Sequence, residues 1–211
     1  MQSRFILCCL FCYVLCALSC KDLTQAEQPL FDNEGIDAAH TDFTYAPIQE
    51  QIVIPDTTLY EHIVYVALGE VGQIEQTTNW SPQIKEYLAV CNIKTPAYWC
   101  GAFTAWNNIK AGALIPTGCA WTPNWFPKKR VYWNKGNDVN KLLSGTQVGF
   151  YFPSKKRIAH IGVVYYVEDG VIYTIEGNAT KNTASRNGDG VYIKMRQAWE
   201  IYQSADWTKA Q

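Results

Sequence analysis

The hydrophobic period of this chain changes once, near its middle. Apolar residues recur at helical spacing in three early segments, which are 58–69, 82–91 and 100–111. Four later segments are short β-branched or aromatic runs bounded by Gly, Asp and Asn: 148–152, 160–167, 171–176 and 191–196. Helices followed by short strands predict an α+β fold, with N-terminal helices packed on a C-terminal antiparallel sheet. Residues 113–146 have no clear period and are expected to form a long irregular connection.

Each predicted helix begins or ends at a local signal. Thr58 and Glu61 have the spacing of a capping box, and Ser81 precedes a proline, which suits the first helical position. The third helix begins at Cys100 and is expected to stop at Gly112. Cys100 therefore lies in the first turn of a helix, where unpaired backbone N–H groups favour an anion.

The first 56 residues differ in composition from the rest of the chain. Arg4 precedes an apolar run too short to span a bilayer, so we interpret 1–19 as a signal peptide. Residues 20–56 are acidic and lack a periodic pattern, which predicts a tether. Basic residues outnumber acidic ones in 57–211, which we expect to form one folded domain. This charge suits an anionic polymer such as cell wall, although solvated surface charge without a partner explains it equally well.

Cys100 and His160 are candidates for a nucleophile and its base. A thiol attacks as the thiolate, and both a helix N-terminus and an adjacent imidazolium lower the pKa of a thiol. His40 and His62 are the other two histidines, and no His, Cys and carboxylate cluster has the spacing of a zinc site. A thiol enzyme without metal or cofactor is therefore favoured over the alternative that Cys100 is a small buried apolar residue.

The hairpin after His160 decides which polar side chains share its face. A two-residue turn at Asp169-Gly170 would put Glu176 and Asn178 on the opposite face from His160. A three-residue loop over 168–170 would put all three on one face, with Glu176 opposite Gly162. We favour the three-residue loop, because Glu176 can then orient His160 as the third member of a triad, and Asn178 can hold the ring or a substrate carbonyl.

Several segments resemble a CHAP-type domain of the NlpC/P60 cysteine peptidase superfamily over residues 58–200. In chain order they are Glu70-Val71-Gly72, Asn79, Tyr87-Leu88, Trp99-Cys100-Gly101-Ala102-Phe103, His160-Ile161-Gly162-Val163-Val164 and Ile175-Glu176-Gly177-Asn178. The resemblance implies a papain-like α+β fold and cleavage of amide bonds in peptidoglycan, either between muramic acid and L-alanine or within stem and cross-bridge peptides. It implies Cys100 as nucleophile, His160 as general base, Glu176 as its orienter and Asn178 as a fourth polar member.

Cys20 follows small residues in Ala17-Leu18-Ser19, which resembles the lipobox of bacterial lipoproteins. That resemblance implies a lipidated Cys20 and an exported protein anchored in the periplasm or at the outer membrane. Simple secretion after cleavage nearby is the alternative. We expect membrane contact only through this anchor, no nucleic-acid partner and a monomer, since no heptad pattern stands out.

Large aromatic and sulfur-containing side chains complete the prediction. Trp99, Trp121 and Trp125 are candidates to line a groove that stacks on sugar rings, although large aromatics more often fill a core. Cys91 and Cys119 could pair in an oxidising compartment, but a position on a helix and one in a loop do not fix the geometry of a disulfide, so we expect them to be unpaired by default. Two other functions are compatible with the same residues: a non-catalytic wall-binding or protein-binding module, and a cysteine acyltransferase.

Overall fold

The three predicted helices form where the caps and the helical period place them. The computed structural model describes residues 58–181 and 188–209, and contains α1 (Leu59–Gly69), α2 (Pro82–Val90) and α3 (Cys100–Ala111). The capping box at the start of α1 is present, and the Ser81 hydroxyl accepts a 3.2 Å hydrogen bond from a backbone N–H in the first turn of α2.

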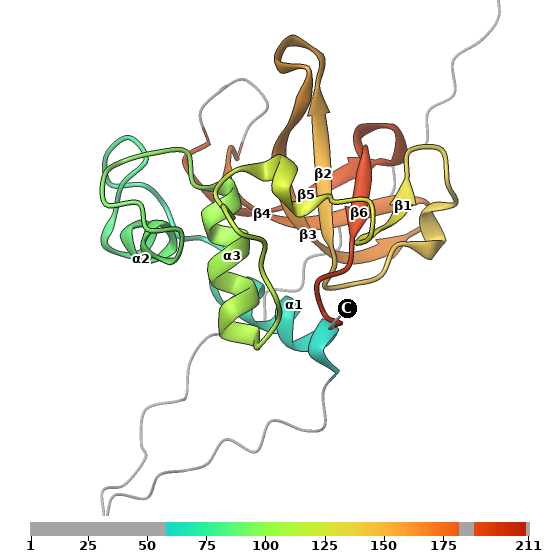
Figure 1. Cartoon of the computed structure of the whole chain (residues 1–211), viewed down its shortest axis with the longest axis horizontal. Coiled ribbons are helices and arrows are strands. Elements are labelled where there is room, and N and C mark those ends of the chain that lie inside the picture. Colours follow the sequence, from blue (N-terminus) through green and yellow to red (C-terminus); the bar gives the residue numbers. More distant parts are fainter. Residues whose placement is uncertain (1–57, 182–187, 210–211) are drawn as a thin grey trace, which may run out of the picture. The chain divides into compact units, whose positions relative to one another are not determined.

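The described residues also form one six-stranded antiparallel sheet in the order β1-β6-β2-β3-β4-β5 (Figure 1). The strands are β1 (Val131–Asn134), β2 (Gln147–Phe152), β3 (Arg157–Glu168), β4 (Val171–Ala179), β5 (Gly190–Gln197) and β6 (Gln203–Ala205). Single turns of 3-10 helix lie at Thr122–Trp125, Val139–Lys141, Pro153–Lys155 and Ala198–Glu200. The predicted α+β class is confirmed.

The segment expected to be irregular contains an edge strand instead. β1 lies within 113–146 and pairs with β6, close to the C-terminal end of the described chain. Both strands are only three or four residues long, too short for a visible period, and they are stabilised by pairing with each other across a long sequence separation. The expectation of a connection without regular structure is therefore wrong for 131–134.

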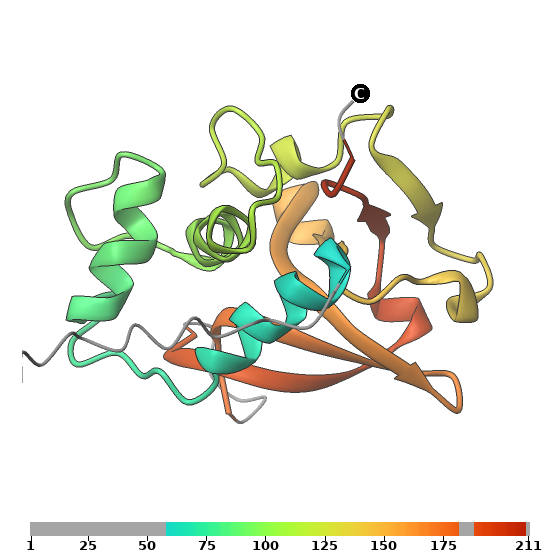
Figure 2. The same cartoon turned by 90° about the horizontal axis from the view of Figure 1, so that it is seen from below.

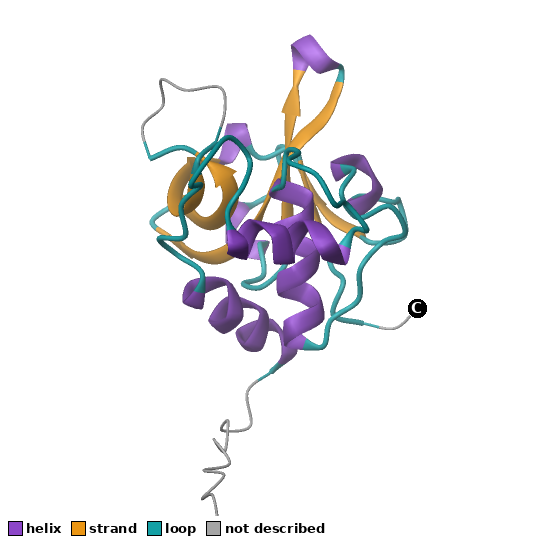
Figure 3. Cartoon of the chain, turned by 90° about the vertical axis from the view of Figure 1, so that its left-hand side faces the viewer, coloured by secondary structure: helices purple, strands orange, loops and turns teal. Residues whose placement is uncertain are grey.

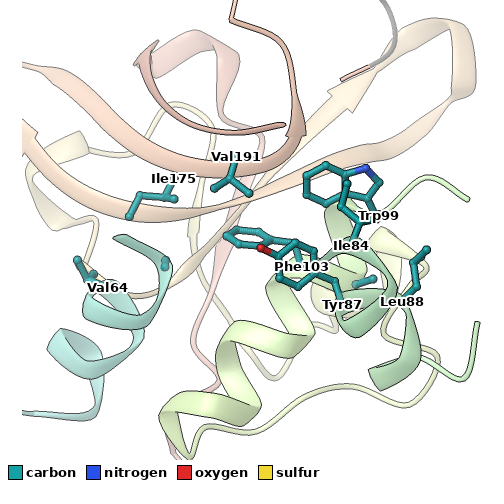
Figure 4. Close-up of a cluster of buried hydrophobic side chains, with 10 residues drawn as sticks. Val64, Ile84, Tyr87, Leu88, Trp99, Phe103, Ile175 and Val191 are labelled. Atoms are coloured by element: carbon teal, nitrogen blue, oxygen red, sulfur yellow. The ribbon is translucent and has the colours of Figure 1, made fainter. Parts of the chain in front are cut away.

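Helix α3 is the central element between the other helices and the sheet. It packs against α1 and α2 and against β3 and β4, and α1 also contacts β3 (Figures 2 and 3). Figure 4 shows Tyr87 and Phe103 from the helices meeting Ile175 and Val191 of the sheet, and all four side chains are buried. Burial of each such side chain contributes about 1.5–3 kcal/mol. This packing fixes the first turn of α3 against the sheet.

The leader predictions concern residues that lie outside the described part of the chain. They are the signal peptide 1–19, the lipidated Cys20 and the acidic tether 20–56. Within the described residues, none of the helices has the length and apolar character needed to span a membrane.

Candidate active site

Cys100, His160, Glu176 and Asn178 line one cleft with a volume of about 1110 Å³. Cys100 is the first residue of α3, and no described residue accepts a hydrogen bond from its backbone N–H. Its side chain is free of any disulfide, and the residue is 7% exposed. The predicted position of Cys100 at the head of a helix is confirmed, and the unpaired N–H groups of a first helical turn favour an anion there.

The β3–β4 hairpin brings His160 and Glu176 together by a different route from the predicted one. Its turn has two residues, Asp169-Gly170, both with positive φ, so the expected three-residue loop is wrong. The register then shifts between Val164 and Tyr166, which is a β-bulge. The bulge adds one residue to β3 and returns Glu176 to the face of His160.

The Glu176 side chain lies across β3 at Gly162. A Cβ atom at Gly162 would lie 2.7 Å from Glu176 Cγ, so only a residue without a side chain lets the glutamate cross β3 here. The expected placement of Glu176 against Gly162 is therefore confirmed. From this position its carboxylate reaches the imidazole, with 2.8 Å between His160 Nε2 and Glu176 Oε2.

The two nitrogens of His160 face different partners. Because an ionised carboxylate only accepts hydrogen bonds, Nε2 carries the proton that is donated to Glu176. Nδ1 is the nitrogen left to face Cys100, whose side chain also acts on the pKa of the ring. Burial lowers the pKa of His160, but the hydrogen bonds to Cys100 and Glu176 and their charges outweigh burial and raise this pKa to about 9. The site therefore favours the imidazolium form of His160.

Glu176 is fully buried and has a hydrogen-bond donor at each lone-pair direction. Its Oε1 accepts from Thr174 Oγ1 at 2.6 Å and Arg196 Nε at 2.8 Å. Its Oε2 accepts from His160 Nε2 and from Arg196 Nη2, the latter at 2.6 Å. Burial raises the pKa of Glu176, but the hydrogen bonds and charges of His160 and Arg196 hold it well below its usual value. Glu176 is therefore a permanent anion behind His160.

Arg196 and Thr174 bind Glu176 although no sequence pattern predicted a role for either. Arg196 on β5 binds Glu176 through two nitrogens, and its Nη1 donates to Glu200 Oε1 at 3.1 Å. The alternation of Lys194 and Arg196 with apolar residues was visible in the sequence and indicates that both lie on one face of a strand. The connection between β4 and β5 is long, however, so no turn type fixes which β4 residue lies beside them.

Asn178 holds the main chain next to Cys100. With its amide oriented to satisfy both neighbours, its carbonyl accepts a 3.0 Å hydrogen bond from the Trp99 N–H and its amino group donates to the Gly188 carbonyl at 3.1 Å. The partner of Asn178 is therefore the residue before Cys100, and not the imidazole ring or a substrate carbonyl, as the sequence had suggested.

The three tryptophans predicted to line a groove have different positions. Trp121 is 50% exposed and lines the cleft. Trp99 and Trp125 are wholly buried: the Trp99 indole N–H donates to Glu75, and the Trp125 indole N–H donates to the Cys119 carbonyl. The groove prediction is wrong for these two, because both rings are core side chains with their single polar atom paired internally.

Cys91 and Cys119 form a disulfide, which corrects the expectation that they are unpaired. Cys91 caps the C-terminus of α2, and Cys119 lies in the loop that packs on the first turn of α3. A Cβ atom at Gly101 would lie 2.7 Å from the Cys119 and Ala120 carbonyl oxygens, which shows how closely this loop approaches the start of α3. The disulfide thus fastens the loop that carries Trp121 beside Cys100.

No group of three or more His, Cys, Asp and Glu side chains in 58–181 and 188–209 is arranged to hold a metal ion. The expectation of a cofactor-free enzyme stays a prediction. Comparison with known proteins finds no matching family model and no matching curated protein. The likeness to CHAP-type domains therefore rests on the motifs quoted above.

Proposed function

We propose that this protein is a cysteine amidase or peptidase that cleaves amide bonds of bacterial peptidoglycan. The observation that carries the proposal is that Cys100, His160 and Glu176 line one cleft, with His160 hydrogen-bonded to Glu176 and its pKa raised by both neighbours. A thiol at a helix N-terminus, an imidazole bonded to it and a buried carboxylate are the parts that thiol acyl transfer requires. The substrate class follows from the resemblance to CHAP-type domains. We also propose that the α+β fold is papain-like, as the same resemblance implies.

The chemistry follows from the two partners of the imidazole. The Cys100 thiolate attacks the amide carbon, and the backbone N–H of Cys100, which has no acceptor among the described residues, donates to the oxyanion. His160 gives its Nδ1 proton to the departing amine, which leaves an acyl-enzyme on the Cys100 sulfur. His160 then takes a proton from water, which attacks the thioester and regenerates the thiol. Glu176 keeps the ring oriented throughout and stabilises its positive charge.

The location belongs to the same proposal. We propose an exported protein, anchored by lipid at Cys20 in the periplasm or at the outer membrane, acting as a monomer on peptidoglycan. The Cys91–Cys119 disulfide supports export, because disulfides persist in oxidising compartments.

The test is release of soluble fragments from purified peptidoglycan, followed by mass spectrometry of the products. Cys100→Ser is the matched control, since it replaces one atom and keeps a group able to hydrogen-bond His160. We expect fragments from the wild-type protein alone, with new termini that identify the bond. Wall binding by both proteins without fragments would contradict the proposal in favour of a binding module. Products that incorporate an added amine in place of water would indicate an acyltransferase.

A further inference from the structure

The cleft around Cys100 carries more positive charge than its carboxylates neutralise. Its cationic lining residues are Lys155, Arg157, Lys194 and Arg196. Arg196 is neutralised by Glu176 and Glu200, which are also the acidic residues that line the cleft. Among residues 58–181 and 188–209, no carboxylate pairs with the other three cations. The cleft therefore has a surplus of positive charge facing the space that a substrate would occupy.

Arg157 is the most firmly held of these unneutralised cations. Its guanidinium carbon lies 3.9 Å from the centroid of the Trp121 ring. Its Nη1 donates to the Ile158 carbonyl at 3.0 Å and to Thr122 Oγ1 at 3.4 Å. Thr122 is itself fixed, because its hydroxyl donates to the same carbonyl at 2.7 Å. Stacking and two hydrogen bonds hold the guanidinium plane in place before any ligand arrives.

The remaining donors of Arg157 form one edge of the guanidinium. Neither Nε nor Nη2 has an acceptor among the residues that the structure describes. Two parallel N–H groups on this edge match the two oxygens of a carboxylate, and such bidentate pairs are the strong form of this contact. Arg196 binds Glu176 through the same two nitrogens elsewhere in the cleft, which shows the geometry already realised inside the molecule.

The loop that carries Trp121, on which Arg157 stacks, has a fixed position relative to Cys100. Trp121 follows the Cys119 and Ala120 carbonyls that pack against Gly101, the residue after Cys100. The disulfide and the Trp125 hydrogen bond to Cys119 hold the same loop. A ligand carboxylate on Arg157 would therefore lie at a set offset from the Cys100 sulfur, which is the condition for selecting a substrate.

Lys155 adds a second positive charge to the lining of the same cleft. Its Nζ lies 5.8 Å from the Tyr98 ring centroid and 5.7 Å from that of Phe152, and both rings line the cleft. Exposed aromatic faces beside cations suit a ligand with an apolar backbone and an anionic group.

We propose that Arg157, held on Trp121, is a carboxylate-binding subsite, and that the amide cleaved by Cys100 belongs to a peptide with a free carboxylate near the scissile bond. This inference rests on the proposed amidase function and narrows its substrate class. It predicts discrimination between a carboxylate and the carboxamide of the same shape, because a carboxamide carries no charge and offers only one acceptor oxygen to the guanidinium edge.

The experiment uses two synthetic peptides that differ only by a glutamate carboxylate or its carboxamide near the scissile amide. We expect kcat/KM of the wild-type protein to be about 10- to 100-fold higher for the carboxylate peptide. Arg157→Gln should reduce kcat/KM for the carboxylate peptide alone and bring the ratio close to one. Lys156→Gln is the matched control, because Lys156 is an exposed cation next to Arg157 that does not line the cleft. It should keep the wild-type ratio.

Equal kcat/KM values for both peptides with the wild-type protein would overturn the subsite, and so would an Arg157→Gln variant that lowers both values equally. The ratio of the two kcat/KM values for the wild-type protein tests the subsite even if Arg157→Gln does not fold. If neither peptide is cleaved, calorimetric titration of both peptides into Cys100→Ala separates the two proposals. Tighter binding of the carboxylate peptide would support the subsite while the amidase proposal fails, and equal binding would overturn the subsite too.

Discussion

The two sides of the His160 ring differ in how completely their polar groups are paired. On the side of Glu176, the carboxylate is fully buried and accepts from Thr174, His160 and Arg196. On the side of Cys100, the ring borders an open cleft, and the backbone N–H of Cys100 has no acceptor in the described chain. Buried polar groups are normally paired, so the unpaired donors mark where a ligand would bind. The paired side is a rigid support, and the open side is where the proposed reaction would take place.

Replacing His160, whose ring joins the two sides, should have the largest effect on catalysis. His160→Ala removes both the base and the proton donor, and we expect kcat on peptidoglycan fragments to fall by about 10⁴-fold. His62→Ala is the matched control, because His62 lies on α1 and does not line the cleft. Steady-state kinetics of both variants provide the measurement. A His160→Ala variant with near wild-type kcat would exclude His160 from the mechanism.

Trp121 and Trp125 are only four residues apart and show the same contrast between an open and a buried position. Trp125→Ala empties a fully buried site and should lower the free energy of unfolding by about 3–5 kcal/mol. Trp121→Ala removes a half-exposed ring that stacks on Arg157, and should lower the free energy of unfolding by about 1 kcal/mol or less. Urea denaturation measures both. Similar losses from the two substitutions would show that Trp121 is a structural residue.

Glu176→Gln tests whether the paired side is a support. The variant leaves Arg196 with Glu200 alone, and we expect a loss of about 2–3 kcal/mol in the free energy of unfolding. We expect kcat to fall by about 100-fold, since the imidazolium loses its counter-charge. Glu200→Gln removes the more exposed carboxylate from the same arginine and should cost about 1 kcal/mol or less. Equal losses from the two variants would contradict the distinct role of Glu176.

The smallest expected effect is that of pH on the free energy of unfolding, which should change in one direction only. The pKa of His160 rises from 6.5 to about 9 on folding, so its stabilising contribution is complete below about pH 6.5 and is lost as pH rises through about 9. The free energy of unfolding should therefore decrease across this window, and His160→Gln should flatten the decrease. Urea titrations at several pH values test this. An unchanged slope in the variant would indicate that another group is responsible.

The parts of the molecule that sequence analysis anticipated are those determined by neighbouring residues. The caps at Thr58 and Ser81 act within one turn, and the α3 helix begins at Cys100 as predicted. The burial of Trp125, the Cys91–Cys119 bond and the reach of Arg196 all depend on how distant elements pack. No local pattern contains that information, which is why Cys100, His160 and Glu176 were singled out from the sequence while Thr174 and Arg196 were not.

The β3–β4 hairpin has a consequence for how such chains tolerate insertions and deletions. Its two-residue turn and its bulge near Tyr165 offset each other, so that Glu176 shares the His160 face. Deleting one residue at the bulge would move Glu176 to the other face, and a second change of one residue in the turn would bring it back. The alignment of base and carboxylate thus depends on the parity of the residues between them, and hairpins of different length can present the same pair.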